Sequence, residues 1–348
     1  MIGRVILLGQ VNGQDAAALM VDGQLLDFLI DPRDDTPLAG AIYRATVDRQ
    51  VKGQGGVFVK LPNGMMGFLR QVSGLAPGQK TLVQLTGFAE DGKALPVTSR
   101  LLFKSRLVIV TPGAPGSNIS RRIKDEDLRQ ALQGVADSAM TGSSSDLGLI
   151  LRSACATADL DEIRQDIADM RLLAENVLAD LAGGPELLVD GALAHEAAWR
   201  DWADPEPDAV EQHPTALEDN GVLEAIDALL APMVPLDTGG SMIIEPTRAL
   251  VAVDVNTGLD TSPAASLKVN IAAARDLPRQ LRLRGLGGQV VVDFAPMPKR
   301  DRAILEQVLR AAFKGEAAET SLVGWTPLGL YELVRKRDRQ PLRDLMKA

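Results

Sequence analysis

The sequence predicts a mixed α+β fold built from several small domains. The chain has 348 residues, enough for about two ordinary domains or for several small ones. Residues 1–102 consist of short apolar runs separated by Gly, Asn, Asp and Pro, a pattern typical of small antiparallel sheets. From residue 103 onward, stretches with helical periodicity alternate with strand-like runs, which is typical of α/β structure.

The first 102 residues are expected to form two β-structures in succession. Residues 1–38 contain the hairpin signals Asn12-Gly13 and Asp22-Gly23, which readily adopt the positive φ angles of tight turns. Residues 39–102 are predicted to form a small barrel, because closely spaced strands and turns are typical of one. Its candidate strands are 41–48, 56–61, 66–69 and 81–86.

Residues 103–180 are expected to combine a sheet with two helices, the second capped by Asp159. The predicted elements are strands at 107–111 and 147–151 and helices at 125–135 and 159–181. The segment 181–215 is rich in Pro, Gly and acidic residues, and it carries Trp199 and Trp202 on a short predicted helix.

Residues 216–348 predict an α/β domain in which strands and helices alternate. Pro278 should kink or break the long helix that contains it. The nearly unbroken apolar run Gln289–Phe294 is typical of a strand buried on both faces. The predicted helices are 221–231, 264–284, 299–313 and 328–346, and the predicted strands are 241–244, 250–255, 289–294 and 319–324.

The composition excludes several kinds of protein. The single cysteine, Cys155, allows neither an intrachain disulfide nor a Cys-x-x-Cys zinc site, and two histidines are too few for a His-rich metal site. A working metal should therefore be held by carboxylates, which favours Mg²⁺, with Mn²⁺ as the alternative. No stretch approaches the roughly 20 apolar residues that span a bilayer, and no signal peptide is recognisable, so we expect a cytoplasmic protein.

The charge is distributed unevenly along the chain. The net charge is −9, and the segment 196–227, with ten acids and one base, accounts for all of it. The segments 268–310 and 335–348 are basic, at +5 and +4. The acidic segment is either solvated surface that keeps the protein soluble or a cover over a basic groove, and the sequence leaves both interpretations open.

Two carboxylates form the most informative pattern. Asp254 and Asn256 are two residues apart on a predicted strand, so their oxygens share one face and can both approach a hard cation. Asp293 ends the predicted strand 289–294, and a buried carboxylate is costly unless it is paired or metal-bound. Together they predict a metal–phosphate site, with Arg279, Arg282 and Arg284 near enough in sequence to bind phosphate oxygens. The simpler alternative is that each aspartate only caps a helix or a strand end.

A longer series of motifs resembles the ribonuclease E/G family. Around the two carboxylates the motifs are Asp254-Val255-Asn256-Thr257-Gly258, the segment 279–288 and Val292-Asp293-Phe294. Further matching segments are 40–43, 67–69, 118–123, 148–154 and 239–244. The resemblance therefore extends over most of the chain, and its motifs follow one another in the order the family shows.

The resemblance implies a composite α+β architecture. An RNase H-like piece would be formed by residues 1–38 and by 181–215, which looks shortened and acidic here. An S1 RNA-binding barrel would occupy 39–102, a 5′-sensor region 103–180 and a DNase I-like catalytic domain 216–348.

The resemblance also implies a function and the residues that carry it out. The family's members cut single-stranded RNA to leave 5′-phosphate and 3′-hydroxyl ends, with Mg²⁺ held by the aspartates matching Asp254 and Asp293 and assisted by the residue matching Asn256. RNA beside the cleavage site would be contacted by the residues matching Phe58, Phe68 and Lys93. A 5′-monophosphate would be bound by the residues matching Arg152 and Ser153.

Some positions depart from the family pattern. Ser153 stands where the family has Thr, which keeps the hydroxyl, and Cys155 stands where it usually has Gly. The Cys-x-x-Cys zinc link that joins two family protomers is absent, so we expect no structural zinc and no zinc-linked dimer, and the oligomeric state stays open. The alternative function is a catalytically weak or inactive RNA-binding protein. An unrelated phosphotransfer enzyme is disfavoured, because the chain lacks a Gly-x-x-x-x-Gly-Lys phosphate loop.

Overall fold

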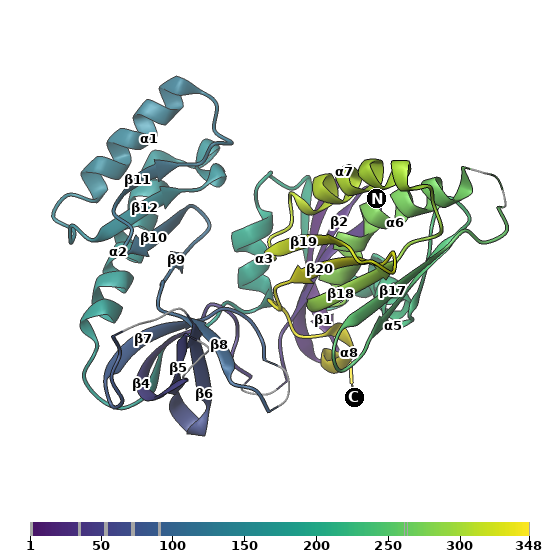
Figure 1. The fold of residues 1–348 in the computed structure, drawn as a ribbon. Helices are drawn as coiled ribbons and strands as arrows, with labels where there is room; N and C mark the ends of the chain where they lie inside the picture. Colours follow the sequence, from purple (N-terminus) through teal and green to yellow (C-terminus); the bar gives the residue numbers. More distant parts are fainter. Residues whose placement is uncertain are drawn as a thin grey trace.

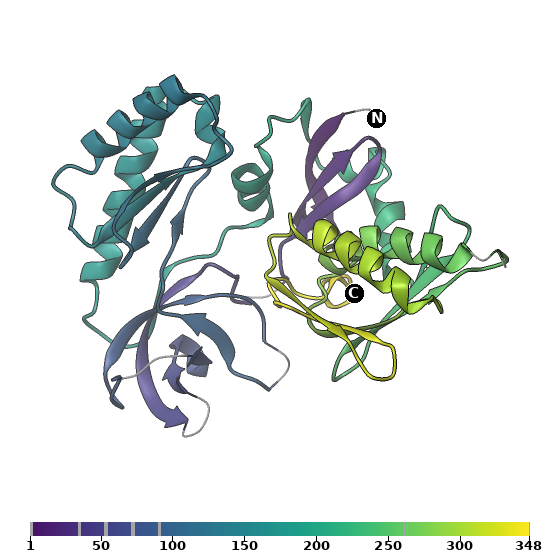
Figure 2. The same ribbon diagram turned by 45° about the horizontal axis from the view of Figure 1, so that its top comes forward.

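The computed structural model describes residues 3–33, 36–51, 55–70, 74–89, 92–260, 262 and 264–347. Within them the chain forms four sheets with helices, a mixed α+β fold (Figure 1). The barrel strands and the sheet with α1 and α2 lie on one side of the molecule, and the sheets formed by the two ends of the chain lie on the other (Figures 1 and 2). None of the described helices is both long and apolar enough to span a membrane.

The N-terminal sheet has the strand order β14-β1-β2-β3. Its strands are β1 (Arg4–Val11), β2 (Gln14–Val21), β3 (Gln24–Ile30) and the later β14 (Ala209–Gln212), which runs parallel to β1. The two predicted hairpin turns are confirmed, since Asn12 and Asp22 have φ angles of 52° and 48° and each is followed by a positive-φ glycine. One face packs on α3 (Ala194–Trp202), and the other packs on α4 (Ala216–Asp219) and α5 (Val222–Leu230).

Five strands close into the predicted barrel, in the order β4-β5-β6-β8-β7 with β7 returning to β4. Their bounds are β4 (Ile42–Val51), β5 (Gly56–Lys60), β6 (Met66–Arg70), β7 (Lys80–Leu85) and β8 (Leu95–Thr98), with a short 3-10 helix at Pro62–Gly64. Strand β8 was not predicted. The later strand β13 (Glu186–Val189) adds to the outside of β4, where the buried Arg44 guanidinium donates to the Gly184 carbonyl at 2.8 Å and pairs with the carboxylates of Asp180 and Glu186.

A third sheet, in the order β11-β12-β10-β9, packs against two helices. The helices are α1 (Glu126–Ala139) and α2 (Leu160–Ala179), and the predicted cap at Asp159 is confirmed by its bond from the Asp161 amide. The strands are β9 (Phe103–Lys104), β10 (Val108–Pro112), β11 (Gly116–Ile119) and β12 (Leu147–Leu151), followed by a 3-10 helix at Ser153–Ala156. Strands β9 and β11 were not predicted, because two to four residues give too short a periodic signal.

Cys155 lies in the core of this third region. Its thiol is fully buried and donates to the Leu107 carbonyl at 3.2 Å, and burial raises the pKa of the thiol to about 12. Because the thiolate is the reactive form, we expect iodoacetamide to leave the native protein unmodified at pH 8 and to label it fully in urea. Mass spectrometry of both samples is the measurement. Rapid labelling of the native protein would contradict the buried placement.

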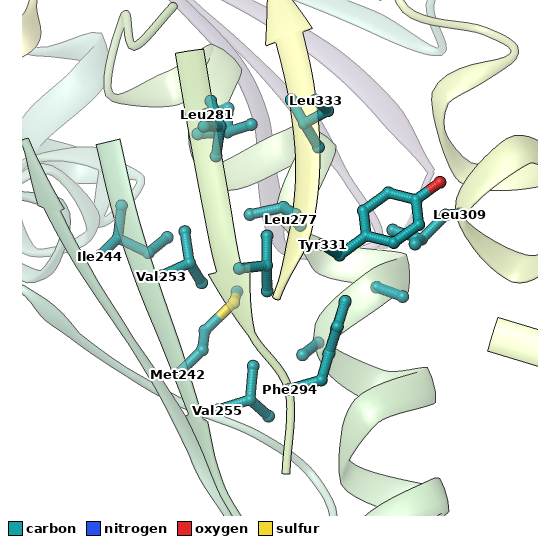
Figure 3. Packing of buried hydrophobic residues seen from close by; sticks show 14 of the residues in the cluster. Met242, Ile244, Val253, Val255, Leu277, Leu281, Phe294, Leu309, Tyr331 and Leu333 are labelled. Atoms are coloured by element: carbon teal, nitrogen blue, oxygen red, sulfur yellow. The ribbon is translucent and has the colours of Figure 1, made fainter. Parts of the chain in front are cut away.

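The C-terminal sheet has the order β15-β16-β17-β18-β20-β19. Helices α6 (Ala265–Leu283) and α7 (Lys299–Phe313) lie side by side along one of its faces (Figures 1 and 2). Figure 3 shows Val253 and Val255 packing with Met242 and Ile244 in the apolar layer between sheet and helices. The strands are β15 (Met233–Pro235), β16 (Ser241–Pro246), β17 (Val251–Asn256), β18 (Gly288–Asp293), β19 (Thr320–Trp325) and β20 (Tyr331–Arg335).

Three predictions for this region are wrong. The segment 328–346 is not one helix: it forms β20, in which buried and less buried residues alternate, and then the short α8 (Leu342–Leu345). Strand β18 is covered on one face only, because α6 and α7 both lie on the same side of the sheet. Helix α6 runs through Pro278 without a break, held by buried side chains on both sides of the proline.

The barrel docks against the chain that follows β20. The amide of Phe88 donates to the Arg337 carbonyl at 3.0 Å. A Cβ atom at Gly87 would lie 2.0 Å from the same oxygen, so only glycine permits this approach. The contact places the barrel beside the C-terminal sheet.

Candidate active site

The two predicted metal-binding carboxylates lie directly opposite each other. Strands β17 and β18 are parallel neighbours joined by α6, and their register pairs Asp254 with Asp293. Paired residues on neighbouring strands are about 4.8 Å apart and project to the same face of the sheet. Both side chains are exposed, on the face opposite to α6 and α7. The expectation that Asp293 is buried is therefore wrong, although the expected proximity of the two carboxylates is present.

Asn256 lies on the same face, as its spacing from Asp254 predicts. Its Nδ2 donates to Asp254 Oδ2 at 2.7 Å, which orients that carboxylate. Along β17 the alternate residues Val251, Val253 and Val255 are buried in the core. The alternation of apolar and polar residues thus decides which way the carboxylate points.

The turn before β16 packs tightly against the end of β17. A Cβ atom at Gly240 would lie 2.3 Å from the Asn256 carbonyl oxygen, and one at Gly258 would lie 2.5 Å from the Gly239 carbonyl oxygen. Gly239 and Gly258 also have φ angles of 82° and 66°. These glycines let the two segments approach closely, and the approach fixes the backbone that carries Asn256.

The donor set suits a small hard cation. Two carboxylates and one amide oxygen, all exposed at one edge of the sheet, match the few protein ligands and several waters that Mg²⁺ prefers. Among the described residues no group of three His, Cys, Asp or Glu side chains could hold a metal. A cation held by Asp254 and Asp293 would fill its other positions with water or phosphate oxygens.

A buried amide missed by the sequence analysis anchors the segment after Asp293. Asn270, fully buried in α6, donates from Nδ2 to the Ala295 carbonyl at 2.9 Å and accepts from the Ala295 amide at 2.9 Å. Both bonds hold the chain two residues beyond Asp293. The only signal in the sequence is an asparagine on the apolar face of a helix.

Aromatic and basic groups surround the end of β18. Phe294 contacts Trp325 and Tyr331 with ring centroids 5.9 and 6.3 Å away. The Arg302 guanidinium lies 4.3 Å from the centre of the Trp325 ring, a cation–π contact. It comes from α7, which starts at Lys299, six residues after Asp293.

The three arginines predicted to bind RNA are instead bonded within the protein. Arg279 pairs with Asp276 at 2.6 Å and donates to the Leu25 carbonyl at 3.0 Å. Arg282 pairs with Glu316 and donates to the Leu26 carbonyl at 2.8 Å. These bonds attach α6 to β3 of the N-terminal sheet.

Arg284 is the most enclosed of the three. It is 7% exposed and donates to the Ala231 carbonyl at 2.8 Å. Burial, followed by the nearby positive charge of Arg343, lowers the pKa of Arg284 to about 10. Arg279 and Arg282 attach α6 to β3, whereas Arg284 bonds to the end of α5 within the C-terminal region. The prediction that these three arginines bind RNA is not supported by their positions.

Phe58 and Phe68 form a pair on the outside of the barrel. They are register partners on β5 and β6, their ring centroids are 5.2 Å apart, and both are half-buried and lie outside the apolar barrel core. Exposed Arg49 and Arg70 lie over the two rings, at 5.2 and 5.9 Å. Neither arginine was predicted, although both are close in sequence to the aromatic residues. Lys93 is exposed in the turn before β8.

Arg152 lies where the third region meets α3. Its Nη1 donates to the Ser105 and Arg200 carbonyls at 2.5 and 2.9 Å, and its Nη2 donates to Asp201 at 3.0 Å. Burial opposes ionisation of Asp201, but hydrogen bonds from Arg200 and the charge of Lys104 outweigh it and lower the pKa of Asp201 to about 2. Asp201 is therefore a carboxylate at neutral pH.

Ser153 also faces an acidic partner. Its hydroxyl donates to the carboxylate of Asp204, just after α3, and Arg122 Nη1 donates to the same oxygen at 3.2 Å. Arg122 Nη1 also lies 3.4 Å from the Ser153 hydroxyl. The structure thus brings Arg152 and Ser153 close together, and it sets carboxylates of the acidic segment against both.

Comparison with known proteins identifies the family to which the chain is related. A model of the Ribonuclease E/G family matches residues 103–213 and 206–338, which is more than half of the chain. Ribonuclease E of Nostoc sp. is 31% identical, with 78% of this chain and 45% of that protein covered. Ribonuclease G of Salmonella typhimurium and of Escherichia coli are each 26% identical, with 98% of this chain and 81% of each relative covered. The chain spans less than half the length of the Nostoc relative. The predicted membership is confirmed: the chain belongs to the ribonuclease E/G family.

Proposed function

We propose that this protein is a Mg²⁺-dependent endoribonuclease that cuts single-stranded RNA, with Mn²⁺ as an alternative metal, in cytoplasmic RNA processing or decay. The observation that carries the proposal is the register of β17 and β18, which sets Asp254 against Asp293 with Asn256 on the same face. Family membership supports a nuclease of this kind, since the compared relatives are named ribonucleases E and G.

Each polar side chain at this edge has a defined role in the proposal. Asp254 and Asp293 hold the ion, and Asn256 orients the Asp254 carboxylate through its 2.7 Å bond. The bound ion supplies a water of lowered pKa and neutralises charge on the scissile phosphate. Attack by water in line with the 3′-oxygen breaks the P–O3′ bond and leaves a 5′-phosphate and a 3′-hydroxyl.

The RNA would be held by the barrel beside the active site. Phe58 and Phe68 offer ring faces on which bases can stack, and stacking is tolerant of sequence because every base has a π-face. Arg49 and Arg70, over those rings, supply positive charge for the phosphates, and Lys93 adds a cation from the turn before β8. The barrel is then the S1 domain of the family.

Membership of the ribonuclease E/G family also underlies the domain boundaries that we propose. We assign 1–38 with 181–215 to the RNase H-like part, 39–102 to the S1 barrel, 103–180 to the 5′-sensor region and 216–348 to the DNase I-like catalytic domain. The proximity of β14 to β1 supports the first pairing, because it joins these two distant segments in one sheet. Arg152 and Ser153 are the proposed sensor residues. The absence of a zinc-linked dimer stays a prediction.

Incubation with a short, A/U-rich single-stranded RNA tests the proposed activity. We expect internal cleavage in Mg²⁺, no cleavage in EDTA, and recovery when Mg²⁺ is returned in excess. The product ends are identified by mass spectrometry, which separates a 5′-phosphate from a 5′-hydroxyl. Binding without cleavage in Mg²⁺ or Mn²⁺ would contradict the nuclease and favour the RNA-binding alternative.

A further inference from the structure

We infer that Asp204 is a specificity-determining residue that fills the 5′-phosphate site from within the chain and makes cleavage indifferent to the phosphorylation of the RNA 5′ end. This inference rests on the proposed function, because it concerns the sensor of the same nuclease. It also answers a question the sequence leaves open, namely whether the acidic segment 196–227 only solvates the protein or covers basic groups.

The carboxylate of Asp204 occupies the donors that would bind a phosphate. It accepts from the Ser153 hydroxyl and from Arg122 Nη1, at 3.2 Å for the arginine. A hydroxyl and a guanidinium are the donor types that recognise phosphate oxygens. A carboxylate is the closest match to a phosphate among protein side chains, since it is an anion with acceptor oxygens only.

The second sensor residue is also engaged. Arg152 uses Nη1 for two backbone carbonyls and Nη2 for Asp201 at 3.0 Å. Lys104 pairs with the same carboxylate at 2.5 Å, and Arg200 pairs with it at 2.9 Å. To bind at this site, a terminal phosphate would have to displace two carboxylates. It would then lie close to them, and their negative charge would repel its own.

The position of the two acids is enforced by a buried anchor. Trp202, the last residue of α3, is 6% exposed and packs in the core of the N-terminal sheet. Its indole donates to Asp27 at 3.2 Å, and its carbonyl accepts from Arg4 Nη2 at 3.0 Å. Asp201 and Asp204 lie one residue before and two residues after this anchor, so they cannot leave the sensor residues without disturbing a packed core.

The balance of charge explains why Asp204 rather than Asp201 decides the outcome. Asp201 pairs with Lys104, Arg152 and Arg200, so its removal would leave three cations close together without a counter-charge. Asp204 pairs with Arg122 at 3.2 Å and is half-buried at the surface. Burial lowers the pKa of Arg4, and the negative charge of Asp204 opposes that shift. Because the Arg122 side chain is 65% exposed, water can solvate it when Asp204 is removed, and the Ser153 hydroxyl and the Arg122 guanidinium then become open to a phosphate.

The test compares Asp204→Ala with Glu206→Ala on two RNAs that differ only in a 5′-phosphate or 5′-hydroxyl. Glu206 is a matched control, since it lies two residues away in the same acidic segment and is exposed. We expect the unaltered protein and Glu206→Ala to cut both RNAs at equal rates. Asp204→Ala should prefer the 5′-phosphorylated RNA by about 10-fold or more, the value of one or two charge-assisted hydrogen bonds.

Two results would overturn the inference. One is an unaltered protein that already prefers the 5′-phosphorylated RNA, and the other is an Asp204→Ala variant that still cuts both RNAs equally. If no RNA is cut, the proposed nuclease fails, and fluorescence anisotropy with the same RNAs decides the inference separately. Tighter binding of the phosphorylated RNA by Asp204→Ala alone then supports it, and equal binding overturns it. Thermal melting of both variants verifies that they fold.

Discussion

Asp254→Asn is expected to lower the rate of RNA cleavage by at least about 10³-fold, because loss of a metal-held charge removes several kcal/mol of transition-state stabilisation. The neutral amide keeps the size of the carboxylate, so the sheet should be unchanged. RNA binding should remain close to that of the unaltered protein, since Phe58 and Phe68 lie on the barrel. Asp293→Asn should have the same effect, because its side chain is the register partner of Asp254.

Glu245→Gln is the matched control for this prediction. Glu245 is an exposed carboxylate on β16, and its register partner is Ala252, which lies on the same face as Asp254. Cleavage is measured in single-turnover reactions over a range of Mg²⁺ concentrations, and binding is measured by anisotropy in EDTA. An Asp254→Asn protein that cuts as fast as Glu245→Gln would remove Asp254 from the catalytic site.

Glu316→Gln is expected to destabilise the protein by about 3–5 kcal/mol, the usual cost of leaving a buried charge without its partner. Glu316 follows α7, and its side chain is 7% exposed. It accepts from Arg335 of β20 at 2.8 Å and pairs with Arg282 of α6. Because Arg335 is only 2% exposed, water cannot replace the lost carboxylate.

Urea unfolding followed by tryptophan fluorescence measures this effect. The matched control is Glu319→Gln, since Glu319 is exposed and lies three residues along the same segment. We expect the unfolding midpoint of Glu316→Gln to fall well below that of Glu319→Gln. Equal midpoints would show that water or another group reaches Arg335, contrary to the burial that the structure describes.

The spacing of apolar residues in the C-terminal region explains why its long helix α7 could be predicted. Helix α7 was predicted at its observed bounds, because its apolar residues recur with a helical period. The segment that forms β20 was misassigned, since its period-two alternation covers only five residues between two turns. Strands β13 and β14 escaped prediction because each has four residues and is stabilised by pairing with a strand far away in the chain.

The arginines of α6 show a second limit of local patterns. A row of basic residues beside two carboxylates is equally consistent with a phosphate-binding surface and with a set of hydrogen bonds that join two parts of the protein. Arg279 and Arg282 are engaged because β3, more than 250 residues earlier, lays its carbonyl groups against the helix. No short stretch of the sequence contains both an arginine of α6 and the β3 carbonyl group that it binds.

Turn chemistry and side-chain alternation act within a few residues, so local patterns were enough to predict the hairpins, the barrel and the face of β17 on which Asp254 and Asn256 lie. The class of fold and the family were predictable too, from the succession of elements and of motifs along the chain. Three features became visible only in the folded protein: Asp293 lies opposite Asp254, α6 bonds to β3, and Asp201 and Asp204 contact the proposed sensor residues. Each of these depends on contacts between distant segments, and such contacts are set by the packing of whole domains rather than by any local pattern.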